Sequence, residues 1–324
     1  MQTVQQTDYD AFSSKLACLS KGYLPPNEQS LITPIKGFVS IYQGYKDLHL
    51  QYFQALKGEF GGRRLASKIN RSIQNSQPVM NYGTYLRTLS IDIPLLSYIN
   101  EIAPSEQCQI VNLGCGSDLR CSQFVDKGEF PQVMKYIDLD FKQSIEFKQS
   151  VLQKLPQGPS NDIYEAVSCD LNNIDETMSV LTKLLKADIP TVFITECALC
   201  YMPQEESQIL IDSIRKTFNT GVWLSYDPIG GDEPNDRFGK IMKDNLLMSR
   251  NLDLPTLLIF NSKDTYSNRW SQYEQVTIQN MWDFLQSTIS PIEQKRLQSV
   301  QFLDEIEELR IMQSHYVTMK AQWQ

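Results

Sequence analysis

Four short apolar segments of the chain each end in an acidic residue, and these acids recur at a regular interval. The segments cover residues 136–140, 166–170, 192–196 and 222–227. Their terminal acids, Asp140, Asp170, Glu196 and Asp227, lie 30, 26 and 31 residues apart. An interval of about 30 residues is the length of one strand–helix–strand unit. The pattern therefore predicts an α/β fold built on a mostly parallel sheet.

A glycine turn precedes these segments. Residues 110–113 form an apolar strand-like run that leads into Gly114-Cys115-Gly116-Ser117-Asp118. Glycines at such a turn let backbone N–H groups approach a ligand closely. A dinucleotide fingerprint requires a further glycine where this chain has Leu119. The turn therefore favours a ligand without phosphate, and S-adenosylmethionine is such a ligand.

Three of the acids are candidate ligand-binding residues, because ligands of open parallel sheets bind at the carboxyl ends of the strands. Asp140 stands 24 residues beyond Gly116, where a carboxylate binds ribose hydroxyls, or alternatively caps the next helix. Asp170 accepts the adenine amino group or caps a helix. Glu196 faces the ammonium or sulfonium side of the ligand, or is an ordinary surface acid.

The amino-terminal region predicts helices rather than strands. Phe12, Leu16, Leu19 and Tyr23 follow helical spacing up to Pro25. Because residues 1–80 lack a sheet repeat, we expect them to form a helical lid on the main domain.

Further elements follow from local signals. A helix expected over 81–105 is interrupted by Pro94, and the helix after Met202 has Pro203 at its first position. The remaining expected elements are a loop over 228–234, a helix over 236–250, a strand over 275–278, a helix starting at the capping box Ser290-Pro291-Ile292-Glu293, a helix reaching Met312 and a strand over 315–323. We expect one domain over 1–324, with a lid (1–80), a cofactor-binding βα core (108–230) and substrate-side helices and closing strands (231–324).

Composition excludes some classes of function. A net charge of −8 and a pI near 5.0 argue against a nucleic-acid-binding face. No apolar run of about 18 residues predicts a membrane span, and residues 1–6 lack signal-peptide features. The seven scattered cysteines indicate reduced thiols and a cytoplasmic protein. Cys197 and Cys200 have no second cysteine pair, and the chain contains two histidines, so we expect no metal site.

Longer motifs carry a family resemblance. They are Val79-Met80-Asn81-Tyr82-Gly83-Thr84-Tyr85-Leu86-Arg87-Thr88, residues 111–118 with the glycine turn, Glu196-Cys197-Ala198-Leu199-Cys200-Tyr201-Met202 and Asn235-Asp236-Arg237-Phe238-Gly239. Together they resemble the leucine carboxyl methyltransferases, in particular the fungal members, and the likeness extends from Thr7 to Trp323. The resemblance implies a Rossmann-like class I fold with a mostly parallel seven-stranded sheet, helices on both faces and an N-terminal lid.

The resemblance also implies a reaction. The enzyme would transfer a methyl group from S-adenosyl-L-methionine to the α-carboxylate of the C-terminal leucine of the type 2A protein phosphatase catalytic subunit. The products would be S-adenosyl-L-homocysteine and a methyl ester that regulates phosphatase assembly. The partner would be bound by its tail and adjoining surface. A monomer is the default expectation, and charge and hydropathy predict that it binds neither nucleic acid nor membrane.

Residues carry over from the family by motif. The resemblance implies that the cofactor is contacted by Lys15, Arg87, Gly114, Asp140, Asp170, Leu171 and Glu196, to which the glycine turn adds Gly116. Arg87 and Tyr201 would lie at the acceptor carboxylate as the catalytic residues. Because a carboxylate is already ionised at neutral pH, its attack needs positioning rather than a general base. Animal members have alanine at the position of Cys115, which argues against a catalytic thiol there.

Three alternatives stay open at this point. A related transferase that modifies a tRNA base carries an additional C-terminal repeat domain, for which no segment follows Trp323. Other small-molecule O-methyltransferases explain the lid motifs less well. A non-catalytic scaffold that binds the phosphatase would have no chemical need for Gly114, Gly116, Asp140 and Glu196.

Overall fold

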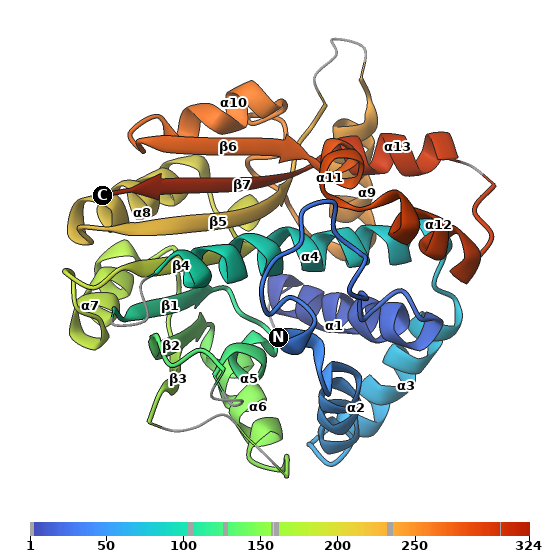
Figure 1. The fold of residues 1–324 in the computed structure, drawn as a ribbon, viewed down its shortest axis with the longest axis horizontal. Helices are drawn as coiled ribbons and strands as arrows, with labels where there is room; N and C mark the ends of the chain where they lie inside the picture. The colour runs from blue at the N-terminus through green and yellow to red at the C-terminus, as the bar shows by residue number, and fades with distance from the viewer. Residues whose placement is uncertain are drawn as a thin grey trace.

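A seven-stranded, mostly parallel sheet runs through the centre of the molecule, with helices on both faces (Figure 1). The computed structural model describes residues 3–102, 106–125, 129–156, 158, 162–231, 236–304 and 306–324. The strands are β1 (Cys108–Leu113), β2 (Val133–Asp140), β3 (Tyr164–Ser168), β4 (Thr191–Glu196), β5 (Gly221–Pro228), β6 (Gln275–Asn280) and β7 (Tyr316–Trp323). Their order in the sheet is β3-β2-β1-β4-β5-β7-β6. The predicted fold class is confirmed.

Helices fill the intervals between the strands. They are α1 (Thr3–Lys21), η1 (Ser40–Tyr42), α2 (Tyr45–Leu56), α3 (Gly62–Gln74), α4 (Pro78–Glu101), α5 (Arg120–Phe124), α6 (Lys142–Leu152), α7 (Ile174–Leu184), η2 (Leu199–Tyr201), α8 (Gln204–Thr217), α9 (Phe238–Arg250), α10 (Lys263–Ser267), η3 (Asn268–Trp270), α11 (Met281–Thr288), α12 (Pro291–Val300) and α13 (Ile306–Ser314). None of the described helices is both long and apolar enough to cross a membrane.

Strands β1, β4 and β5 are buried on both faces, and this explains their nearly continuous apolar sequences. Alternate residues of each strand point to opposite faces of the sheet. Ile110 and Val192 join one core cluster with residues of α1 and α4, whereas Val111 and Phe193 join a second cluster with residues of α7 and α8. Strands β1 to β5 all run in the same direction. Their carboxyl ends, with the glycine turn and the acids, therefore meet at one edge of the sheet.

β7 is antiparallel to both of its neighbours, β5 and β6. The strands predicted over 275–278 and 315–323 are thus confirmed as β6 and β7, although β7 begins one residue later, at Tyr316. The last strand in the sequence is therefore not at the edge of the sheet but inside it.

The expected break at Pro94 was wrong. Helix α4 runs from Pro78 to Glu101 with Pro94 inside it. A proline has no N–H to donate to the carbonyl of the residue four positions earlier, which here is Ser90. The Oγ1 of Thr318 in β7 donates to this carbonyl at 3.3 Å. A neighbouring strand therefore satisfies the carbonyl that the proline leaves open, and the helix continues.

Two helix starts differ in detail from the prediction. Pro203 is the N-cap residue of α8, which begins at Gln204. At α12, the Oγ of Ser290 accepts from the backbone N–H of Glu293 at 3.1 Å, as a cap should. The carboxylate of Glu293 turns into the core instead, where it accepts from the Oη of Tyr85 at 2.7 Å and from Arg296. Only one of the two reciprocal hydrogen bonds of a capping box is therefore present.

The segment after β5 lies partly outside the described residues. The helix predicted over 236–250 is α9, which begins at Phe238. Residues 232–234 of the predicted loop, and Asn235 of the last family motif, are not described.

Helix α6 carries a buried lysine that yields a stability prediction. The Nζ of Lys148 lies 2.7 Å from the Oδ2 of Asp138 in β2, and both side chains are 1% exposed. Lys148→Met should destabilise the fold by about 3–5 kcal/mol, because Asp138 would remain as an unpaired buried charge. The measurement is the free energy of unfolding from urea titration.

A matched control lies on the same helix. Lys142 is 78% exposed and lies 3.8 Å from Glu146. Lys142→Met should change the free energy of unfolding by less than about 0.5 kcal/mol. Equal effects of the two substitutions would show that the buried pair does not stabilise the fold.

Candidate active site

A cavity of about 630 Å³ lies at the carboxyl ends of the parallel strands. This volume is in the range of small-molecule binding sites. All nine residues predicted from the sequence line it, namely Lys15, Arg87, Gly114, Gly116, Asp140, Asp170, Leu171, Glu196 and Tyr201. Helices α1, α4 and α9 supply further walls. The structure thus brings these residues together, while the group that each one binds stays a prediction.

The glycine turn has a backbone that other residues would not tolerate. Gly114 and Gly116 have φ angles of 74° and 46°. A Cβ on Gly114 would lie 2.9 Å from the Cβ of Ala198, and a Cβ on Gly116 would overlap the carboxylate of Asp8. Glycine is therefore required at both positions, because φ is positive and because the side chains of Ala198 and Asp8 lie too close for a Cβ.

Asp140 holds the glycine turn against the end of β2. Its Oδ2 accepts from the backbone N–H of Gly116 at 2.8 Å, and its Oδ1 accepts from that of Phe141 at 2.7 Å. The N-cap residue of α6 is Phe141, so Asp140 is not the helix cap that the sequence left as an alternative. Burial raises the pKa of Asp140 above its ordinary value, although the two N–H donors act in the opposite direction. Each carboxylate oxygen keeps a lone pair for a hydroxyl donor from a ligand.

Asp170 and Leu171 follow β3. The Oδ1 of Asp170 accepts from the backbone N–H and the side-chain amide of Asn172, both at 3.0 Å. The cap of α7 is Asn173, whose side chain accepts from the N–H of Glu176. The alternative role of Asp170 as a helix cap is therefore not observed. Leu171 beside it is buried and offers an apolar surface to the cavity.

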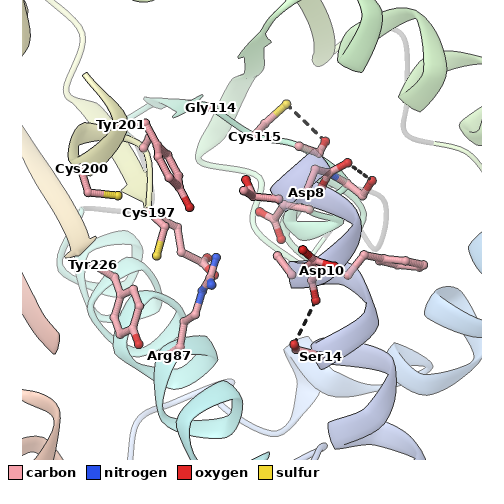
Figure 2. A pocket seen from close by; sticks show the side chains of 18 of the residues that line it. Asp8, Asp10, Ser14, Arg87, Gly114, Cys115, Cys197, Cys200, Tyr201 and Tyr226 are labelled. Atoms are coloured by element: carbon pink, nitrogen blue, oxygen red, sulfur yellow. Dashed lines mark hydrogen bonds and ion pairs between the residues drawn. The ribbon is translucent and has the colours of Figure 1, made fainter. Parts of the chain in front are cut away.

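Asp8 of α1 is a residue of the cavity that sequence reasoning missed. Its Oδ1 accepts from the N–H of Ser117 at 2.6 Å, and its Oδ2 accepts from the Oγ of Ser117 at 2.7 Å. Burial raises the pKa of Asp8 to about 6, despite these two bonds. Figure 2 shows Asp8 directed from α1 toward the glycine turn. The contact joins residues 109 positions apart, so no local pattern could have indicated it.

A second acid on α1 ties this helix to its neighbours. Asp10 pairs with Arg250 at the end of α9 and lies 3.5 Å from Lys68 of α3. Both Asp10 and Arg250 line the cavity. The wall formed by α1, which also carries Lys15, is thus attached by hydrogen bonds to the glycine turn and by ion pairs to α3 and α9.

Arg87 and Glu196 form an ion pair across the cavity wall. The Nε of Arg87 in α4 donates to the Oε1 of Glu196 at 2.6 Å. The guanidinium lies 5.5 Å from the ring centre of Tyr226. In Figure 2, Arg87, Tyr201 and Tyr226 lie on one side of the cavity and α1, with Asp8 and Asp10, on the other. Glu196 was expected to face a ligand cation, and in the structure it already holds an arginine.

The other oxygen of Glu196 belongs to a buried network. Its Oε2 accepts from the Nη1 of Arg120 at 2.5 Å, and Arg120 also binds Asp92 at 2.6 Å and Asp118 at 3.0 Å. Burial alone would raise the pKa of Glu196, but Arg120 and Arg87 hold it well below its usual range. Glu196 is therefore a fixed anion at neutral pH and neither donates nor accepts a proton there.

Sequence reasoning missed Asp92 and Arg120, although a signal for one of them existed. Asp92 is a lone acid among the apolar residues of α4, and it is fully buried. An acid in such a position is rarely buried without a charged partner. Arg120 follows the glycine turn closely, yet only the fold brings it to Asp92 and Glu196.

Two tyrosine hydroxyls and one cysteine thiol of the wall are neutral. Burial raises the pKa of the Tyr201 and Tyr226 hydroxyls well above the usual value, so both stay protonated. Burial likewise raises the pKa of the Cys115 thiol, which makes it a poor nucleophile. Cys197 has a φ of 56° and donates its N–H to the carbonyl of Tyr226 at 2.7 Å. Within the described ranges, no cluster of three or more histidine, cysteine or acidic residues could hold a metal ion.

Comparison with known proteins identifies similar chains. Residues 48–215 match the family model described as leucine carboxyl methyltransferase. A leucine carboxyl methyltransferase 1 of Kluyveromyces lactis is 40% identical over 343 residues, which cover 99% of each chain. One of Eremothecium gossypii is 39% identical over 339 residues and also covers 99% of each chain.

Solved structures resemble the fold. A putative methyltransferase from Thermobifida fusca has a TM-score of 0.54 at 9% identity, covering 85% of this chain and 94% of its own. A DUF574 family protein from Streptomyces avermitilis has a TM-score of 0.52 at 10% identity, covering 85% and 96%. At such low identity the likeness shows a shared fold alone.

The contact of Asp8 with Ser117 predicts a dependence of stability on pH. Burial raises the pKa of Asp8 from 3.8 to about 6, so the folded state binds the proton more tightly than the unfolded state. Protonation of Asp8 therefore stabilises the fold as the pH falls through about 6 toward 3.8. Asp8→Asn removes the buried charge but can keep both bonds to Ser117. At about pH 7.5 this variant should have a Tm higher than the parent by about 2 °C or more.

The quantity to measure is the difference in Tm between the parent and Asp8→Asn. It should shrink as the pH is lowered to about 4.5, because the parent then becomes neutral at Asp8 as well. Exposed Asp188 provides the control, since Asp188→Asn should follow the parent at every pH. A Tm difference between parent and Asp8→Asn that does not vary with pH would contradict a titrating Asp8.

Proposed function

The chain belongs to the leucine carboxyl methyltransferase family, and we propose that it methylates the C-terminal leucine of the type 2A protein phosphatase catalytic subunit. Family membership makes it a methyltransferase that acts on a carboxyl group. In the proposed reaction, S-adenosyl-L-methionine is the methyl donor and the α-carboxylate of the leucine is the acceptor. The products are S-adenosyl-L-homocysteine and a methyl ester that regulates assembly of the phosphatase. One observation carries the proposal: Arg87 lies in the same cavity as the glycine turn and Asp140.

The glycine turn and its neighbours fit a nucleoside without phosphate. Two carboxylates, Asp8 and Asp140, accept from the N–H groups of Ser117 and Gly116. In dinucleotide-binding folds, N–H groups of this turn face a pyrophosphate. Here the acids have taken those donors and would repel an anion. Asp140 can accept from the two ribose hydroxyls, and Leu171 offers an apolar surface to a base.

The acceptor carboxylate needs a cationic partner and a cavity wall that excludes water. Arg87 offers a planar guanidinium, which binds carboxylates in a defined orientation. The stacked rings of Tyr226 and Tyr316, with centres 5.5 Å apart, stand beside it. Arg87 shares its charge with Glu196, so it can orient an acceptor carboxylate without neutralising it fully. A carboxylate that stays partly uncompensated remains the better nucleophile.

The reaction requires no proton transfer by the protein. When bound, S-adenosyl-L-methionine supplies a methyl group on a sulfonium, which a carboxylate oxygen attacks in line while the sulfur keeps the electrons of the broken bond. Arg120 and Arg87 hold the pKa of Glu196 well below its usual range and burial keeps Tyr201 protonated, so neither group takes up a proton at neutral pH. The residues of the cavity act by holding the two groups in line and excluding water.

The cavity lies next to α9 and α3, and we propose that the phosphatase surface around its tail docks there.

The direct test follows labelled methyl transfer from S-adenosyl-L-methionine to the phosphatase catalytic subunit. The matched acceptor is the same subunit without its terminal leucine. Label that is released by mild base and appears only on the intact subunit is expected. Equal labelling of both acceptors would contradict methylation of the C-terminal residue, and no labelling of either would rule out this acceptor.

Substitution of Arg87 tests its role in the reaction. Arg87→Ala should lower kcat/KM for the acceptor by about 10²-fold or more, because a positioned charge-assisted contact is lost. Circular dichroism and thermal unfolding should show a folded protein. Lys183 of α7 is exposed, and Lys183→Ala should keep turnover close to that of the parent. Turnover of Arg87→Ala near the parental value would remove Arg87 from the mechanism.

A further inference from the structure

Arg120 joins three carboxylates from three parts of the fold. Its Nε binds Asp92 of α4 at 2.6 Å, and its Nη1 binds Asp118 of the turn at 3.0 Å and Glu196 of β4 at 2.5 Å. The side chain is 1% exposed, and Asp92 is fully buried. Arg120 is not among the described residues that line the cavity. It can therefore influence a bound substrate only through another residue.

The acids around Arg120 are themselves held in place. The Oη of Tyr42 donates to the Oδ2 of Asp92 at 2.7 Å. The side-chain amide of Asn112 in β1 donates to the Oδ2 of Asp118 at 2.9 Å. The guanidinium thus has fixed partners besides Glu196, and its bond to Glu196 has a fixed direction.

Stability alone does not account for this arrangement. Burying an arginine with carboxylates costs several kcal/mol in desolvation, and apolar residues of similar volume often stabilise a fold equally well. The network, however, includes Glu196, which lines the cavity. Glu196 uses one oxygen for Arg120 and the other for Arg87. The orientation of the Arg87 guanidinium therefore depends on where Arg120 holds Glu196.

We propose that Arg120 is a positioning residue for methyl transfer, which fixes Glu196 and so directs Arg87 toward the acceptor carboxylate. The inference rests on the proposed function for the role of Arg87. Without the guanidinium of Arg120, both oxygens of Glu196 become available to Arg87. An arginine and a carboxylate then favour the bidentate arrangement. Arg87 would turn toward Glu196, and the acceptor would lose its partner.

A double-mutant cycle tests the proposal. Arg120→Lys keeps a positive charge among the acids, but an ammonium lacks the planar array of N–H groups with which a guanidinium binds several carboxylates. It is measured in the parent and in an Arg87→Met background, with labelled transfer to the phosphatase subunit at saturating cofactor. In the parent background it should lower kcat/KM for the acceptor by about 10- to 100-fold. In the Arg87→Met background it should cost less than about twofold, because the residue through which it acts is absent.

Stability is read in parallel, since a purely structural role would behave differently. The fall in Tm caused by Arg120→Lys should persist in the Arg87→Met background, where Glu196 depends more strongly on Arg120. Arg269 is also buried, donates to the Oγ of Ser207 at 2.9 Å and is not among the described cavity residues. Arg269→Lys is the control that should lower Tm but keep turnover within about twofold of the parent. An equal loss of kcat/KM in both backgrounds, or parental turnover of Arg120→Lys, would overturn the proposal.

A milder variant covers the case in which Arg120→Lys does not fold. Asp92→Asn loosens Arg120 from the side away from the cavity and keeps the volume of the side chain. Its smaller loss of kcat/KM should likewise disappear in the Arg87→Met background, and persistence of that loss would count against the inference. Turnover of the parent chain reports on the proposed function by itself. The ratio between backgrounds reports on Arg120.

Discussion

The candidate site depends on the mutual compensation of charges that the fold has removed from water. Two arginines, Arg87 and Arg120, and three acids, Asp92, Asp118 and Glu196, meet at the carboxyl end of β4. They come from α4, from the segment after the glycine turn and from β4 itself. None of these elements can shift alone without leaving an ion unpaired, which costs about 3–5 kcal/mol. The edge of the sheet where strands end in loops, usually its most adaptable part, is thereby made rigid.

This rigidity suits a reaction in which charge disappears but no proton moves. In the proposed reaction a sulfonium and a carboxylate are consumed together, and the products are neutral at both reacting atoms. Beside Arg87, Glu196 is held ionised and the tyrosine hydroxyls are held neutral. A site of this kind has little use for a base and much use for exact placement. Its most important groups are then those that hold others, as Asp8 holds the glycine turn and Arg120 holds Glu196.

The sequence could predict what local repetition determines. The strands and their terminal acids were predictable because a parallel sheet imposes one period on the chain, and the motif residues do line one cavity. The failures have the opposite character. Pro94 stays inside α4 because Thr318, more than 200 positions later, donates a hydrogen bond to the carbonyl of Ser90, which Pro94 cannot pair. Asp8 and Arg120 find partners that no spacing rule connects to them. Helix continuity and buried charge are decided by the tertiary structure, whereas the positions of the strands along the chain follow from a local pattern.

The position of β7 has a consequence for how the protein is made. Residues 316–323 pair with β5 on one side and β6 on the other, although both of those strands precede them in the chain. During synthesis β5 therefore presents an unpaired edge, and β6 has no strand to join, until the ribosome has released this segment. The cofactor-binding half can assemble early, but the sheet cannot close before then. An exposed strand edge invites pairing with other chains. The nascent protein should therefore depend on chaperones until residues 316–323 have emerged from the ribosome.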